Sequence, residues 1–327
     1  MKTETITIIG LEKIGASVGL AIKKSPLKVT IVGHDAESYR TREAKEALNA
    51  IDKIEWNLVN AAAAGDIVVL ALPASQLQAA LQAIGDDLKP HALVLDMSPL
   101  KGHGVVWAQK YLRQGHYVGA VPVLSASSLL DGREVLFSAS AELFADSQLA
   151  LMPGPDVDEQ AVETAVKFGK LLGATPFFLQ ADEYDRLMQG VNTLPSLVAA
   201  ALYQAVSQTA GWKDLQRLAG SSFAMMTQPL QQGSEAAFLA YHQRETAVHW
   251  LSAVIKELET VRQLLQANEL DIISAHFEQL ESAYQKWLGQ RMENNWIEIE
   301  PTSYEGTSIG EQLFGRWGKR DNKKQDE

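Results

Sequence analysis

The chain has 327 residues, more than one hydrophobic core usually supports, so two domains are expected. Its formal net charge of −11 is spread along the sequence, which argues against partners such as nucleic acid or an anionic membrane surface. The absence of cysteine excludes disulfides, thiolate nucleophiles and cysteine-ligated metals. No apolar run approaches the roughly 20 residues of a membrane span, and the first residues lack the pattern of a signal peptide. We therefore expect a cytoplasmic protein.

The first half of the chain alternates short β-branched runs with helical patterns, which is typical of βαβ units around a parallel sheet. The runs at 66–73 and 91–98 are continuously apolar, as expected for strands that are covered on both faces. Strands are predicted at residues 5–10, 28–35, 66–73, 91–98, 116–124, 148–153 and 175–180, with a helix over 159–173. This pattern predicts an α/β fold in which residues 1–180 form a Rossmann-type, doubly wound parallel sheet.

The periodicity is helical from residue 181 to 293. Apolar stripes over 247–265 and 270–288 must pack against each other or against a second copy, so an all-helical domain that forms a homodimer is predicted. Pro195 lies inside a helical pattern and predicts a break near 193–196. Residues 294–327 are expected to form a partly disordered tail.

The turn after the first predicted strand carries a variant of the G-x-G-x-x-G motif, which binds the diphosphate of a dinucleotide. Gly10 and Gly15 occupy the outer glycine positions, but Glu12 occupies the middle one, where a carboxylate opposes the phosphates. Asp35 ends the second strand, where an acid accepts ribose hydroxyls and favours NAD over NADP. The remaining predicted cofactor contacts are Leu11, Ile14, Leu72 and Pro73. A Rossmann fold that has lost its ligand is the alternative.

Several longer segments resemble the prephenate and arogenate dehydrogenase family from about residue 5 to 290. They are "IIGLEKIGASVGLAI", "GHD", "DIVVLALP", "LDMSPLKG", "EYDRLMQGVNTLPSLVAAAL" and "LAGSSFAMMTQP". The resemblance implies an N-terminal Rossmann domain, a helical dimerisation domain and oxidative decarboxylation of prephenate or arogenate on the route to tyrosine. It also assigns Asp96, Ser98 and Lys101 to the family's D-x-x-S-x-K motif, so Ser98 and Lys101 are the catalytic candidates. A strand-end turn followed by a solvated lysine is the alternative for these two residues.

Other positions depart from the family pattern. Val121 precedes Pro122 where the family has a histidine that polarises the ring hydroxyl. The family's S-H-L-P-H motif corresponds to residues 192–196, which keep the proline and lose both histidines, and Ala224 and Gln228 replace two arginines. The candidate substrate contacts that remain are Asn192, Thr193, Ser196, Gln228 and Arg244, of which Arg244 matches a family arginine. A dianion is expected to bind weakly at such a site.

Two functions follow from these observations. The first is an NAD-linked oxidoreductase that acts on a small acid less anionic than prephenate and is slow on prephenate itself. The second is a non-catalytic family member kept as a homodimeric scaffold for binding or regulation. No metal site is predicted, because His242 and His249 share a helix face without a third ligand. His103 is expected to be a solvated loop residue.

Overall fold

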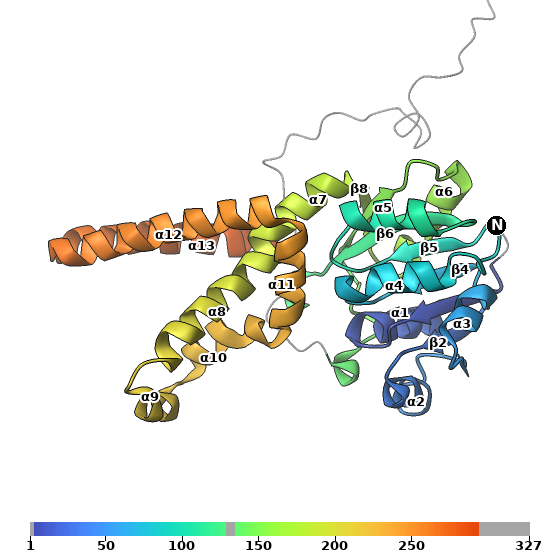
Figure 1. Cartoon of the computed structure of the whole chain (residues 1–327), viewed down its shortest axis with the longest axis horizontal. Helices are drawn as coiled ribbons and strands as arrows, with labels where there is room; N and C mark the ends of the chain where they lie inside the picture. The colour runs from blue at the N-terminus through green and yellow to red at the C-terminus, as the bar shows by residue number, and fades with distance from the viewer. Residues whose placement is uncertain (1–2, 129–134, 294–327) are drawn as a thin grey trace, which may run out of the picture.

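The computed structural model describes residues 3–128 and 135–293. Figure 1 shows an α/β body, which contains the N-terminal half of the chain, and a helical part from which a long helical hairpin projects. The body is built on one eight-stranded sheet in the order β3-β2-β1-β4-β5-β6-β7-β8. Its strands are β1 (Thr5–Ile9), β2 (Thr30–His34), β3 (Lys53–Ile54), β4 (Ile67–Leu70), β5 (Leu93–Asp96), β6 (His116–Val123), β7 (Gln148–Pro153) and β8 (Thr175–Phe178).

The doubly wound sheet is confirmed, with one correction to its strand directions. Strands β1 to β6 are parallel, but β7 is antiparallel to β6, and β8 is parallel to β7. In the described part of the β6–β7 connection there are only two short 3₁₀ helices, η1 (Ala126–Ser128) and η2 (Leu136–Ser138). A parallel pair is usually joined through an α-helix, and the described part of this connection contains none, which agrees with the antiparallel pairing of β7 with β6.

Helices cover both faces of the sheet, which explains why its central strands are continuously apolar. Helices α1 (Lys13–Lys24) and α6 (Glu159–Leu171) pack with alternate strand residues such as Ile6 and Ile8 in one core. Helices α3 (Leu58–Ala64), α4 (Ala74–Ile84) and α5 (Gly102–Tyr111) pack with residues such as Ile9 on the other face. Helix α2 (Ser38–Glu46) lies beside the edge strand β3.

After β8 the described part of the chain contains helices and no strand. They are α7 (Ala181–Met188), the π-helix η3 (Gln189–Thr193), α8 (Leu194–Ser207), α9 (Trp212–Leu218), α10 (Ser221–Thr227), the 3₁₀ helix η4 (Gln228–Gln232), α11 (Gly233–His242), α12 (Arg244–Ala267) and α13 (Leu270–Met292). In place of the predicted break near Pro195, the chain changes from a π-helix, which ends at Thr193, to α8, whose first turn contains Pro195. The domain boundary at residues 180 and 181 stays a prediction, and the predicted tail lies outside the described residues.

Helices α12 and α13 form the hairpin that projects from the body in Figure 1. Asn268 ends α12 in the left-handed conformation with φ 57°, which lets the chain reverse direction. The hairpin exposes apolar side chains over most of its length, namely Ile255, Leu258, Leu265, Leu270, Ile272, Phe277, Leu280, Tyr284 and Trp287. Within the described residues, no helix combines the length and the apolar character needed to cross a membrane.

Candidate functional site

The turn between β1 and α1 requires glycine at two of the three motif positions. Gly10 has φ +90°, and a Cβ atom there would collide with the carbonyl oxygen of Ala71. A Cβ atom on Gly15 would collide with the carbonyl oxygen of Gly10, so α1 can approach the turn closely only because residue 15 lacks a side chain. The strand, turn and helix therefore have the arrangement of a dinucleotide-binding turn.

Glu12 does not strain this turn, since its φ of −76° suits any residue. Its carboxylate forms an ion pair with Arg40, with 2.6 Å between Glu12 Oε1 and Arg40 Nη2. Arg40 Nη1 also lies 3.5 Å from Asp35 Oδ1. The charge that the sequence places in the middle of the turn is thus partnered by a guanidinium from α2.

Asp35 connects the end of β2 to the turn. Its Oδ2 atom accepts a hydrogen bond of 2.7 Å from the backbone N–H of Leu11, and its Oδ1 atom accepts one of 2.8 Å from the backbone N–H of Glu37. A carboxylate has about four lone-pair sites, so these bonds leave acceptor capacity for a ribose. Leu72 and Pro73 are half-buried after β4, close to Gly10, and Ile14 is half-buried in the first turn of α1. The predicted cofactor residues therefore meet at the carboxyl ends of β1, β2 and β4, and they fit a dinucleotide.

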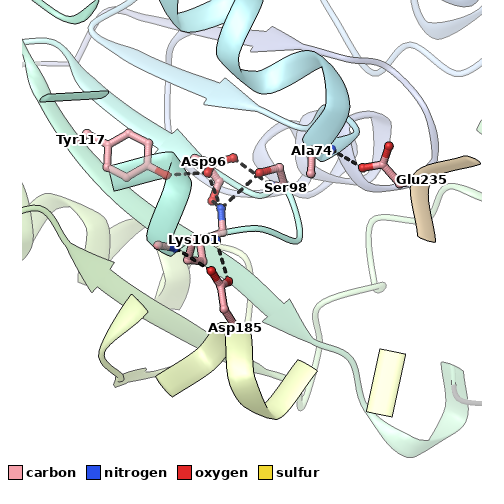
Figure 2. Close-up of polar contacts among 8 residues, drawn as sticks. Ala74, Asp96, Ser98, Lys101, Tyr117, Asp185 and Glu235 are labelled. Atoms are coloured by element: carbon pink, nitrogen blue, oxygen red, sulfur yellow. Dashed lines mark hydrogen bonds and ion pairs between the residues drawn. The ribbon is translucent and has the colours of Figure 1, made fainter. Parts of the chain in front are cut away.

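A second cluster lies at the carboxyl end of β5 and is centred on Lys101 (Figure 2). The Lys101 ammonium is fully buried and forms an ion pair with the Asp96 carboxylate. It also donates to the Asp96 carbonyl at 2.8 Å and to Ser98 Oγ at 3.4 Å. Tyr117 Oη donates to Asp96 Oδ2 at 2.6 Å. Burial lowers the pKa of Lys101 despite the Asp96 charge, and burial beside that charge raises the pKa of Tyr117 well above its usual range.

The burial of Ser98 and Lys101 decides against the alternative given for these two residues, while their catalytic role stays a prediction. Lys101 is 0% exposed and Ser98 is 1% exposed, so the alternative of a solvated lysine is wrong. The residues are also spaced D-x-S-x-x-K in this chain, so the half-buried Pro99, and not Ser98, occupies the serine position of the family motif. Both side chains are engaged in a buried polar cluster, which orders the segment between β5 and α5.

Asp185 on α7 connects this cluster to the helical part (Figure 2). Its two carboxylate oxygens accept the backbone N–H groups of Lys101 at 2.7 Å and Gly102 at 2.8 Å. The side-chain amide of Gln243 donates to Asp185 Oδ2 at 3.2 Å. Burial raises the pKa of Asp185 against the opposing effect of these donors. An acid next to a base at the start of a helix, as in Asp185 and Arg186, is more often a surface pair, but Asp185 is only 1% exposed.

A cavity of about 420 Å³ lies at the junction of α5, α11 and α12. Its lining residues are His103, Tyr241, His242, Gln243, Arg244, Glu245 and Thr246. Arg244 is therefore the predicted substrate contact that lines this hollow. A larger hollow of about 1100 Å³ beside β8 and α7 contains none of the predicted site residues.

The other four predicted substrate contacts do not line this cavity. Asn192 and Gln228 are exposed elsewhere on the helical part. Thr193 is buried, and its hydroxyl has no hydrogen-bond partner within the described residues. Ser196 Oγ donates to the carbonyl of Pro229 at 3.3 Å, which connects α8 to η4. The elements that carry the five predicted contacts nevertheless pack against one another, since α8 contacts η3, η4 and α12.

The imidazoles of His103 and His242, for which the sequence predicts no function, meet at the cavity. His103 is half-buried in the first turn of α5, so the expectation of a loop residue is wrong. Its ring centroid lies 4.6 Å from that of His242 at the end of α11. The two residues are 139 positions apart in the sequence, so no local pattern could have paired them. Among the described residues there is no group of three or more side chains suited to hold a metal ion.

The fold and the turn define a class of protein, a Rossmann-type nucleotide-binding protein with a helical C-terminal region. The sequence model of a family described as "Prephenate dehydrogenase, nucleotide-binding domain" matches residues 18–177, a segment that begins after the glycine turn. A prephenate dehydrogenase of Bacillus subtilis is 26% identical over 288 residues, which cover 84% of this chain and 73% of the relative. A cyclohexadienyl dehydrogenase of Zymomonas mobilis is 24% identical, covering 85% and 94% of the two chains.

A solved structure shows the same fold. A prephenate dehydrogenase of Aquifex aeolicus, in complex with hydroxyphenyl propionate and NAD+, superposes with a TM-score of 0.75 at 18% identity. The match covers 88% of this chain and 99% of that chain. Residues 18–177 thus match the nucleotide-binding domain of prephenate dehydrogenases, and most of the chain is similar to prephenate and cyclohexadienyl dehydrogenases.

Proposed function

We propose that the protein is an NAD-dependent oxidoreductase of the prephenate and arogenate dehydrogenase family. The observation that carries this proposal is the turn at Gly10 and Gly15 with Asp35 at the end of β2, where the shape and the acidic group suit a dinucleotide. The related Aquifex aeolicus structure with NAD+ supports the choice of cofactor. Asp35 disfavours the 2′-phosphate of NADP by its charge.

In this proposal the chain's own residues have distinct tasks. The backbone N–H groups in the first turn of α1 receive the diphosphate, because a helix N-terminus has unsatisfied donors and a positive dipole end. Asp35 accepts the ribose hydroxyls, and Leu72 and Pro73 border the same edge of the sheet. NAD supplies the hydride acceptor when it is bound. Arg244 binds a carboxylate of the substrate at the cavity beside α5.

The substrate is a cyclohexadienyl-type or related small acid that carries less negative charge than prephenate. Val121 is buried against Ala150, Met152 and Tyr184, so an apolar group occupies the place of the family histidine. Ala224 and Gln228 offer no cation. Because general acid–base assistance contributes typically about 10²- to 10⁴-fold in rate, turnover of prephenate should be slow.

A non-catalytic scaffold is the second candidate. It is favoured by the joint replacement of the motif serine by Pro99 and of the family histidine by Val121, which removes two polar groups from the expected substrate site. In either case we propose a cytoplasmic homodimer formed through the helical part, supported by the apolar side chains that the α12–α13 hairpin exposes.

The test is a fluorescence titration with NADH, followed by turnover assays with prephenate and arogenate. The Bacillus subtilis relative assayed in parallel gives the reference rate. We expect micromolar NADH binding and prephenate turnover that is about 10²- to 10⁴-fold slower than the reference. No binding at millimolar NADH would exclude the oxidoreductase and leave the scaffold.

A further inference from the structure

The cavity beside Arg244 contains a pair of facing imidazoles from different parts of the chain. His103 comes from α5, directly after the carboxyl end of β5, and His242 comes from the end of α11. Their ring centroids are 4.6 Å apart and their planes are inclined by 70°. In open α/β sheets ligands bind outside the carboxyl ends of the strands, so this pair lies on the side of the sheet where a substrate is expected.

The surroundings hold both rings in place. Asp185 binds the backbone N–H of Gly102, which precedes His103, and the side chain of Gln243, which follows His242. One buried carboxylate therefore fixes the chain next to each imidazole. Trp107 contacts both rings, tilted against His103 with centroids 5.6 Å apart and edge-on to His242 with centroids 5.7 Å apart, and Phe238 lies 4.3 Å from His242. A site that acts on a bound molecule requires this kind of preorganisation.

The charged groups near the pair come from three elements. Arg244 and Glu245 line the same cavity from the start of α12. On α7, Asp182 and Asp185 lie beside Gly102, the first residue of α5. The Lys101 ammonium pairs with the Asp96 carboxylate. Burial and the neighbouring His103 lower the pKa of His242. At neutral pH His242 is therefore uncharged and able to accept a proton.

We propose that His103 and His242 form the imidazole contact of the substrate site and hold the substrate whose carboxylate Arg244 binds. This inference rests on the proposed oxidoreductase function. It gives the site an imidazole pair on α5 and α11 in place of the family histidines that Val121, Thr193 and Ser196 have replaced. The substrate class is a small hydroxy acid with one carboxylate for Arg244 and one hydroxyl for the pair.

This assignment gives both the hydride and the proton of the oxidation an acceptor. Oxidation of the carbon that carries the hydroxyl releases a hydride to bound NAD+ and a proton from the oxygen. His242 takes that proton, directly or through His103, while the C–O bond becomes a carbonyl. The protonated imidazole then returns the proton to solvent through the open side of the cavity.

The first test needs no turnover. The Cε1–Hε1 NMR signals of the histidines are followed in the full-length, NADH-bound protein while prephenate, arogenate or hydroxyphenyl propionate is added. His103→Asn and His242→Asn assign the two signals. We expect both to shift with at least one compound, while the signal of exposed His249 stays in place. If neither shifts with any of the three compounds, the inference is wrong.

The second test uses the compound that turns over fastest. His242→Asn should lower kcat at least 100-fold with KM changed less than about threefold, and His249→Asn should change neither. The wild-type rate should fall as the pH drops through the lowered pKa of His242, because the protonated ring accepts no proton, and the variant should lose this acid limb. An unchanged kcat in the variant overturns the inference.

A measurement of NADH binding distinguishes a failure of the proposed function from a failure of the role assigned to His103 and His242. If the wild type does not bind NADH, the proposed function fails. If the wild type and both asparagine variants bind NADH equally and melt at the same temperature, but the imidazole signals and kcat do not respond, only the role of the pair is wrong.

Discussion

Glu12 is the residue that most clearly separates this turn from a standard glycine-rich one. Its carboxylate is paired with Arg40, whose guanidinium also lies near Asp35. A unit charge 4 Å from a phosphate charge costs on the order of 1–4 kcal/mol between the dielectric limits of water and a protein surface, and Arg40 offsets part of that cost.

Replacing Glu12 by glycine should therefore raise the affinity for NADH at least several-fold, as measured by fluorescence titration. The variant removes both the charge and the side chain from the middle of the turn. Glu12→Gln, which keeps the length and removes the charge, shows how much of the gain is electrostatic. Equal affinities in the glycine variant and the wild type would mean that the carboxylate lies away from the diphosphate.

Lys101 has a structural task that its position in a family motif does not reveal. Lys101→Met leaves the Asp96 carboxylate buried without its cation, and breaking a buried pair in this way costs about 3–5 kcal/mol. Urea unfolding followed by circular dichroism measures the loss. The exposed pair of Lys167 and Glu163 provides the control, since Lys167→Met should cost less than about 1 kcal/mol. Similar losses in the two variants would contradict the role assigned to Lys101.

At the scale of elements, α11 is the helix that joins the two parts of the molecule. Leu239 is buried in the core formed by α4 and α5. Glu235 accepts hydrogen bonds from the backbone N–H groups of Ala74 and Ser75 and from the Ser75 hydroxyl. A carboxylate from the helical part thus caps the N-terminus of α4, and Figure 2 shows its contact with Ala74.

Glu235→Ala should lower the free energy of unfolding by about 0.5–2 kcal/mol, the usual cost of a lost helix cap. Hydrogen exchange at the amides of Ala74 and Ser75 should accelerate, because these groups lose their acceptor. Glu257→Ala on the exposed surface of α12 serves as the matched control. Unchanged exchange at the two amides would show that the cap contributes little to the structure.

The accuracy of the sequence predictions depends on the range of the interactions. The strands at 66–73 and 91–98 were predictable because burial on both faces leaves a local apolar run. Strand β3, with two residues, leaves no such pattern, and the reversed direction of β7 depends on a connection rather than on the strand itself. The contact of Ala74 with Glu235 spans 161 positions and that of Lys101 with Asp185 spans 84. Periodicity over a window of residues does not detect pairs of this kind.

In the candidate site, too, contacts between residues far apart in the sequence could not be predicted. The glycine turn and Asp35 were predictable because their function resides in one short segment. The burial of Lys101 and the meeting of His103 with His242 were not, since each depends on helices that pack against α5 from the other half of the chain. The family motifs identified the helical positions, but the structure alone shows that Arg244 lines the cavity beside α5 while Thr193 and Ser196 do not.

At the scale of the whole molecule, the α12–α13 hairpin has more apolar surface than a single chain covers (Figure 1). Ile255 is 64% exposed and Leu258 is 62% exposed. The double variant Ile255→Lys and Leu258→Lys should convert the proposed dimer into a monomer, because a buried interface does not accept two unpaired charges. Sedimentation velocity measures the change. Gln263→Lys on the polar side of α12 should remain dimeric, and a dimer in the double variant would exclude this face as the interface.

The buried carboxylate of Asp185 has a consequence for any attempt to separate the halves of this protein. A fragment that stops at residue 180 keeps every strand of the sheet, yet it loses the acceptor for two backbone amides at the start of α5 and the cap on α4. Each lost hydrogen bond costs about 0.5–1.5 kcal/mol, and together they are a substantial part of the stability of a typical domain. The nucleotide-binding half is therefore not a portable module, and a chimaera made from it has to include α7 and α11.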